Sequence, residues 1–147
     1  MKIARLALSL SLSLSLSLSL LSLPALAGEV PDATVAKILG LPAVKHTVRP
    51  ISAYGIKATD VTYLNAQGTE LVTLRLAPAE QFAMWKSVTG IQMAPFPALG
   101  GDAFQYKEIR SVCAKSGASA VCATPDVLNR TKPISDAQLA ELIKAAF

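Results

Sequence analysis

The sequence predicts an α+β fold in which a mainly antiparallel sheet of two hairpins packs against three helices, in the order helix, hairpin, helix, hairpin, helix. Three observations support this class. Apolar residues recur with helical spacing after residue 30, near residue 85 and at the C-terminus. Apolar and polar residues alternate beside turn-forming stretches, as they do in half-buried strands. The two cysteines of the chain lie where a hairpin would place them side by side.

Residues 1–27 have the pattern of a secretory signal peptide. Lys2 and Arg5 precede an uncharged tract of leucine and serine, which ends in Ala-Leu-Ala at residues 25–27. The tract over residues 6–23 is close to the roughly 20 residues that a membrane-spanning helix needs, so an uncleaved anchor is the alternative. Cleavage is the favoured interpretation, because serines interrupt the tract and small residues offer a cleavage position.

Cleavage would leave residues 28–147 as a single α+β domain in the periplasm or secreted. Gly28 is not a cysteine, so we expect no lipid at this position and no stable membrane anchor after leader removal. The whole chain has 14 basic and 10 acidic residues, and loss of the two basic residues of the leader leaves 12 against 10. A nucleic-acid partner is not expected, because binding nucleic acid requires basic residues clustered on one face.

Cys113 and Cys122 are predicted to form a disulfide across the second hairpin. A type II′ turn with Gly117 first places them opposite each other, at a spacing of about 4.5 Å between Cα atoms that a disulfide can bridge. A zinc site needs about four ligands, and a thioredoxin-type dithiol has two residues between its cysteines whereas eight separate these, so both alternatives fit poorly. In an exported protein, a pair of cysteines favours a disulfide bond. We expect it on the less buried face of the hairpin, opposite Val112, Ala114, Val121 and Ala123.

The first helix and the first hairpin have recognisable start and stop signals. The helix is expected to begin with Asp32 as its N-cap and to end at Gly40. Residues 43–55 are expected to form an irregular linker or a short edge strand. Residues 56–76 then predict a hairpin, with a type I turn at residues 65–68 because asparagine comes first and glycine last.

The second and third helices are predicted from apolar stripes. The second places Phe82, Trp85 and Val88 on one side and stops at the following glycine. The third begins with a capping box formed by Ser135 and Gln138. The stripe that should dock the third helix on the domain consists of Leu139, Leu142, Ile143 and Ala146.

A helix that ends in Leu39-Gly40, two hairpins, the turn LGGDAF at residues 99–104 and a closing amphipathic helix together resemble small secreted bacterial domains of the PsbP-like α/β kind. The resemblance covers most of residues 28–147, in the order of elements rather than in a specific motif. It implies an envelope domain, and many such domains are lipoproteins, from which this chain departs because Gly28 replaces the lipidated cysteine. It implies no catalytic residues.

Residues 90–104 are the candidate binding loop. They combine apolar side chains with prolines and glycines and follow no helical or strand period. Such a loop can form a binding surface, or it can fold over the end of the sheet as a small additional core; packing is the favoured interpretation, and the loop is still the best candidate site in the chain. Its candidate residues are Met93, Phe96, Leu99, Asp102 and Phe104.

His46 is the single histidine and the one candidate general base. No Gly-x-Ser-x-Gly turn or other nucleophile motif accompanies it, so a solvated or backbone-bonded histidine in a polar linker is favoured. The phosphate-binding glycine loops and metal-ligand clusters that would indicate a cofactor or a metal are also missing from the sequence, so neither is expected. The sequence therefore favours a non-enzymatic exported domain that binds an envelope protein, a peptide or a small ligand. The alternative is a small hydrolase that uses His46 with a carboxylate such as Asp102.

Overall fold

The computed structural model describes residues 26–128 and 132–147. Apart from its last two residues, the predicted signal peptide of residues 1–27 lies outside the described part of the chain. Within that part, no helix is both long and apolar enough to cross a membrane. The elements in chain order are α1 (Asp32–Leu39), β1 (Lys45–Ala53), β2 (Ile56–Leu64), β3 (Glu70–Pro78), α2 (Gln81–Lys86), β4 (Met93–Pro95), the 3₁₀ helix η1 (Pro97–Leu99), β5 (Phe104–Tyr106), β6 (Ser111–Ser116), β7 (Ser119–Pro125) and α3 (Asp136–Ala146).

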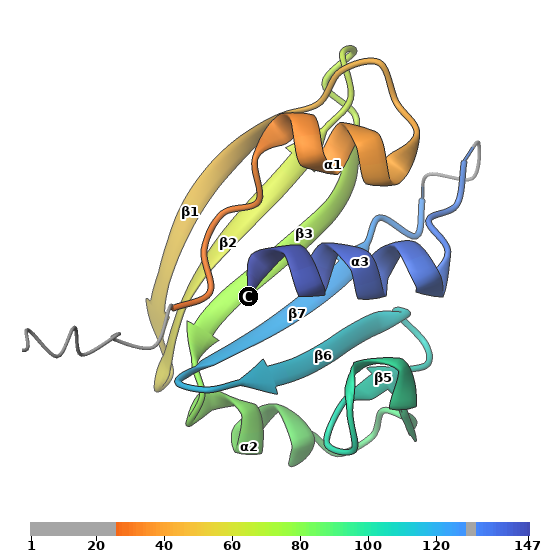
Figure 1. Cartoon of the computed structure of the whole chain (residues 1–147). Coiled ribbons are helices and arrows are strands. Elements are labelled where there is room, and N and C mark those ends of the chain that lie inside the picture. Colours follow the sequence, from red (N-terminus) through yellow and green to blue (C-terminus); the bar gives the residue numbers. More distant parts are fainter. Residues whose placement is uncertain (1–25, 129–131) are drawn as a thin grey trace, which may run out of the picture.

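All seven strands belong to one antiparallel sheet, in the order β1-β2-β3-β7-β6-β5-β4. Helices α1 and α3 cover one face of the sheet, and α2 packs near one end of the opposite face (Figure 1). Because side chains alternate between faces along a strand, every central strand supplies residues to both sides. The predicted α+β class is confirmed, whereas the predicted order with only two hairpins is wrong.

The first strand that the predicted order lacks is β1. It lies within residues 43–55, for which the sequence predicts an irregular linker or a short edge strand. It pairs with β2 over nine residues and forms one edge of the sheet. Pro50 lies in its middle, where the missing backbone N–H is tolerated because an edge strand needs to pair on one side only. Proline and a mostly polar composition concealed this strand in the sequence.

The other missing strands are β4 and β5, each of three residues. They pair with each other, and β5 pairs with β6, so the candidate binding loop at residues 90–104 contains one strand and the start of another. A strand of three residues is too short for an alternation of polar and apolar side chains to be recognised, so residues 90–104 show no strand period in the sequence.

The second hairpin has the predicted register, with Cys113 opposite Cys122 and a disulfide between them. Gly117 at the turn has a φ of 54°, a conformation that favours glycine. The bridge is not on a less buried face, however: both cysteines are buried under α2, against Phe82 and Trp85. A second, smaller core under α2 therefore covers the face of the hairpin that was expected to be less buried.

The helices differ from prediction at their ends. In α3 the capping box of Ser135 and Gln138 is confirmed, and the whole predicted stripe is buried. In α1 the N-cap is Pro31 rather than Asp32, because Asp32 lies in the first turn and directs its carboxylate to a histidine. Helix α2 ends at Lys86 in a tight turn, so Val88 is outside the helix.

Candidate functional site

The face of the sheet that α2 shares carries a row of hydroxyl groups. Thr47, Thr62, Thr73 and Thr124 lie opposite one another on β1, β2, β3 and β7. Ser111 of β6 continues the row, because its hydroxyl is 2.7 Å from that of Thr124. The hydroxyls of Thr62 and Thr73 are 3.0 Å apart. Neighbouring hydroxyls thus bond in pairs and form a polar floor.

A row of charged residues runs beside the hydroxyls. Arg49, Asp60 and Arg75 lie opposite one another on β1, β2 and β3, and Cys122 follows on β7. Arg75 donates from Nε to Asp60 Oδ1 at 2.7 Å and from Nη2 to Oδ2 at 2.8 Å. The Asp60 hydrogen bond is the main reason that the pKa of Arg75 is raised. Arg49 Nη2 is more distant, 3.5 Å from Asp60 Oδ2.

Helix α2 covers the disulfide end of this face and leaves the rows of hydroxyls and charges open. The space beside it is a groove of about 610 Å³, which we call the α2 groove. Its floor contains Asp60, Thr73, Arg75, Ser111 and Thr124. Its wall is apolar and contains Ile56, Met84, Trp85, Val88, Ile91 and Ile109.

Aromatic packing supports the wall of the α2 groove. The Tyr106 hydroxyl donates a hydrogen bond to the backbone carbonyl of Trp85, which ties β5 to α2. Burial raises the pKa of Tyr106. Phe104 meets Tyr106 edge to face at 5.1 Å between ring centroids, and Phe82 lies 5.4 Å from Phe104. The wall therefore rests on a packed aromatic cluster and on the disulfide beneath it.

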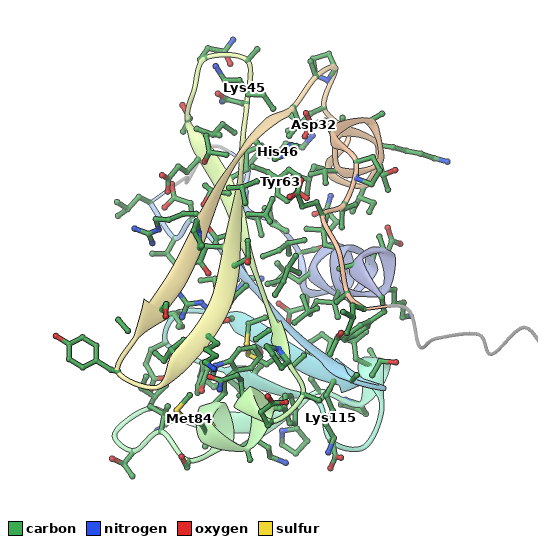
Figure 2. The ribbon with its side chains drawn as sticks, turned by 90° about the vertical axis from the view of Figure 1, so that its left-hand side faces the viewer. Asp32, Lys45, His46, Tyr63, Met84 and Lys115 are labelled. Carbon is green, nitrogen blue, oxygen red and sulfur yellow. A yellow bond between two sulfur atoms is a disulfide. The ribbon has the colours of Figure 1, made fainter. Side chains whose placement is uncertain are left out.

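His46 lies in a different region, beside α1. Figure 2 shows Asp32, His46 and Tyr63 grouped there, whereas Met84 lies at the other end of the molecule beside α2. His46 Nδ1 is 2.6 Å from Asp32 Oδ1, and Nε2 is 3.2 Å from Glu29 Oε2. The hydrogen bond with Asp32 is the main cause of the raised pKa of His46, with smaller contributions from both negative charges. His46 is therefore a partly buried residue of β1 that contacts two carboxylates rather than a solvated residue of a linker.

Tyr63 connects the His46 cluster to the core. Its hydroxyl donates to the Val30 carbonyl at 2.7 Å and accepts from the Val30 N–H at 2.9 Å. Burial raises the pKa of Tyr63 to about 12, so its hydroxyl stays protonated. The His46 ring packs over Tyr63 at 5.6 Å between centroids. These contacts fasten the segment before α1 to β1 and β2.

The structure does not pair His46 with Asp102. Asp102 follows η1, and its Oδ2 lies 3.2 Å from Nζ of Lys115, an exposed residue of β6. The carboxylates bonded to His46 are those of Asp32 and Glu29.

The residues of the candidate binding loop do not form a single surface. Phe96 and Leu99 are partly buried against the core under α1 and α3. Phe104 is buried on the other side, in the aromatic cluster under α2. Met93 is the apolar member that stays exposed, at 40%. Phe96, Leu99 and Phe104 pack against the domain, in line with the interpretation that the sequence favours, and the role of the loop in binding stays a prediction.

Sequence reasoning missed the α2 groove, whose lining comes from five strands, one helix and the loops that follow α2 and β5. The available signal was in β2 and β3, where Asp60 and Arg75 occupy the face opposite the apolar residues of the same strands. Opposite charges at paired positions of adjacent strands indicate a cross-strand ion pair.

The function of the chain is inferred from the site, because comparisons with known proteins do not indicate one. Neither models of protein families, nor curated proteins, nor solved structures gave a match to the chain. In residues 26–128 and 132–147, no group of three or more histidine, cysteine, aspartate or glutamate side chains could hold a metal ion.

Proposed function

We propose that this chain is an exported, non-catalytic domain that binds a small, largely apolar ligand in the α2 groove. The observation that carries the proposal is a groove of about 610 Å³ with an apolar wall and a polar floor. Sites for small molecules typically have about 300–1,000 Å³, mostly apolar linings and a few polar groups that orient the ligand.

The rigidity of the groove also supports a binding role. A disulfide joins the two strands beneath α2, and the Tyr106 hydroxyl holds the backbone of Trp85. A preformed site loses less conformational entropy when a ligand binds than a site that must first become ordered.

Export is supported by the disulfide together with the predicted leader. Disulfides persist in oxidising compartments such as the bacterial periplasm or the extracellular space. The resemblance to PsbP-like envelope domains would place the protein in the same location.

A hydrolase is the less favoured alternative. A general base needs a ring nitrogen that can accept a proton, but both ring nitrogens of His46 face carboxylates, Asp32 and Glu29. Asp102, the carboxylate considered for this role, is engaged by Lys115. The geometry around His46 suits a structural ion pair.

The test uses binding of a neutral apolar dye, N-phenyl-1-naphthylamine, to the purified domain. Trp85 is the single tryptophan of the chain and lies in the groove wall, so its fluorescence should be quenched when the dye binds. Val88→Asp places a charge on the groove wall and should weaken dye binding at least about tenfold. Val127→Asp is the matched control, because Val88 and Val127 are 40% and 54% exposed and Val127 does not line the groove.

Equal dye binding by the Val88→Asp and Val127→Asp variants would rule out the groove as the site. Separately, loss of hydrolysis of an ester or amide substrate in His46→Ala, with the fold intact, would favour the hydrolase.

A further inference from the structure

One carboxylate and one guanidinium group, those of Asp60 and Arg75, lie in the lining of the α2 groove, and a second guanidinium group, that of Arg49, lies beside it, 3.5 Å from Asp60. The Asp60 side chain is only 4% exposed, and both of its oxygens accept hydrogen bonds from Arg75. The side chains of Arg75 and Arg49 are 38% and 77% exposed. One carboxylate thus lies against two guanidinium groups, which leaves one positive charge uncompensated within this cluster.

We infer that the ligand is a small apolar molecule that carries one carboxylate or a similar monoanionic group. Its head group binds the guanidinium groups of Arg75 and Arg49, and its apolar body lies along the groove wall beside Trp85. This assignment rests on the proposed function, because it names the chemistry of the ligand in the same groove.

The geometry of Arg75 supports an anionic head group. Its Nε and Nη2 are used by Asp60, and no described residue accepts a hydrogen bond from Nη1. A carboxylate at Nη1 would form a charge-assisted hydrogen bond, which is about twice as strong as a bond between neutral groups. A cationic head group would face two guanidiniums, and the carboxylate of Asp60 is only 4% exposed and already accepts two hydrogen bonds from Arg75.

The other charged residues around α2 lie outside the groove lining. Lys86 and Lys115 lie over the ring of Phe82 at 5.8 and 5.6 Å from its centroid, and neither lines the groove. Glu108 precedes the wall residue Ile109, and its carboxylate accepts from the backbone N–H of Gln92. The charged residues in the groove lining are Asp60 and Arg75.

The experiment measures displacement of the neutral dye by three molecules with the same ten-carbon chain: decanoate, decanol and decyltrimethylammonium. We expect decanoate to bind about tenfold more tightly than decanol, and the ammonium compound to bind most weakly. The preference for decanoate should decrease as salt is added, because the Arg49 side chain is largely exposed.

Variants then assign the effect to the two arginines. Arg49→Gln should weaken decanoate about two- to fivefold and leave decanol unchanged. Arg75→Lys keeps the charge but loses the planar fork, and should weaken decanoate about tenfold. Lys57→Gln is the control, because Lys57 is an exposed cation of β2 whose side chain alternates to the opposite face of the sheet. Thermal unfolding of each variant verifies that it is folded.

The outcomes separate this inference from the proposed function. If the dye binds but decanoate and decanol displace it equally, the anionic ligand is excluded and the groove remains a binding site. If Arg49→Gln and Lys57→Gln weaken decanoate equally, the effect is general surface charge and the assignment to Arg49 fails. If the dye does not bind, the proposed function itself is contradicted.

Discussion

The two faces of the sheet are built from the same strands but are packed in opposite ways. Under α1 and α3 the side chains are apolar and almost completely buried, with Leu74, Leu139 and Leu142 at the centre. On the other face, the six-residue helix α2 covers the disulfide and an aromatic cluster and leaves hydroxyls and charges open. Because strand side chains alternate, one set of residues can stabilise the fold while the neighbouring set forms a site.

The largest expected effect is a loss of stability on the covered face. Leu142→Ala removes a fully buried side chain of α3 and should lower the free energy of unfolding by about 2–5 kcal/mol. Met84→Ala on α2 should cost less than about 1 kcal/mol, because this side chain is partly exposed in the groove wall. Urea denaturation measures both, and equal losses would contradict the difference between the faces.

The second effect concerns the disulfide on the other face. Replacing Cys113 and Cys122 together by alanine should lower the free energy of unfolding by about 2.5–3 kcal/mol, since the bridge closes a short loop. The domain should still fold, because the larger core does not contain the bridge. Near-UV circular dichroism and urea denaturation test this, and a variant that is unfolded without denaturant would show that the smaller core is essential.

A smaller effect separates the residues of the candidate binding loop. Phe96→Ser should lower the free energy of unfolding by about 1–2 kcal/mol, because the ring packs partly against the larger core. Met93→Ser should change stability by less than about 0.5 kcal/mol, because that side chain is exposed. If Phe96→Ser weakened binding of a partner without any loss of stability, the loop would be a binding surface as the sequence suggested.

The smallest effect is a dependence of stability on pH at His46. The folded state raises the pKa of His46 above its ordinary value of 6.5, chiefly through the hydrogen bond with Asp32. Its stabilising contribution is therefore complete below about pH 6.5 and is lost as the pH rises through the raised pKa. Unfolding in urea at about pH 5.5 and about pH 8.5 measures the change.

His46→Gln is the variant that isolates this effect. It should flatten the pH dependence over this range, because His46 is the single histidine of the chain. An unchanged pH dependence in His46→Gln would mean that another group causes it.

The features that were predicted correctly depend on short-range rules. The register that joins Cys113 to Cys122 follows from a two-residue turn, and the capping box of Ser135 and Gln138 lies within four residues. The position of the turn after β2 is also confirmed, because the N–H of Gly68 donates to the carbonyl of Asn65 at 3.0 Å. In each case the residues that determine the geometry are neighbours in the chain.

The features that were missed depend on contacts between distant residues. His46 faces Asp32 because β1 runs beside α1, and the composition of β1 indicated at most a short edge strand. The α2 groove joins Asp60 and Arg75 to Trp85 and Ser111, which only the order of the seven strands brings together. The burial of the disulfide was missed for the same reason, since it depends on where α2 packs.

The most direct test of the account is a map of backbone amide chemical-shift changes in ¹⁵N-labelled protein as decanoate is added. If decanoate binds in the α2 groove, the changes should concentrate at groove residues such as Thr73, Arg75, Ile109 and Thr124, and Val88→Asp should abolish them. Changes confined to residues 93–104 or to the face under α1 and α3, or no changes at all, would contradict it.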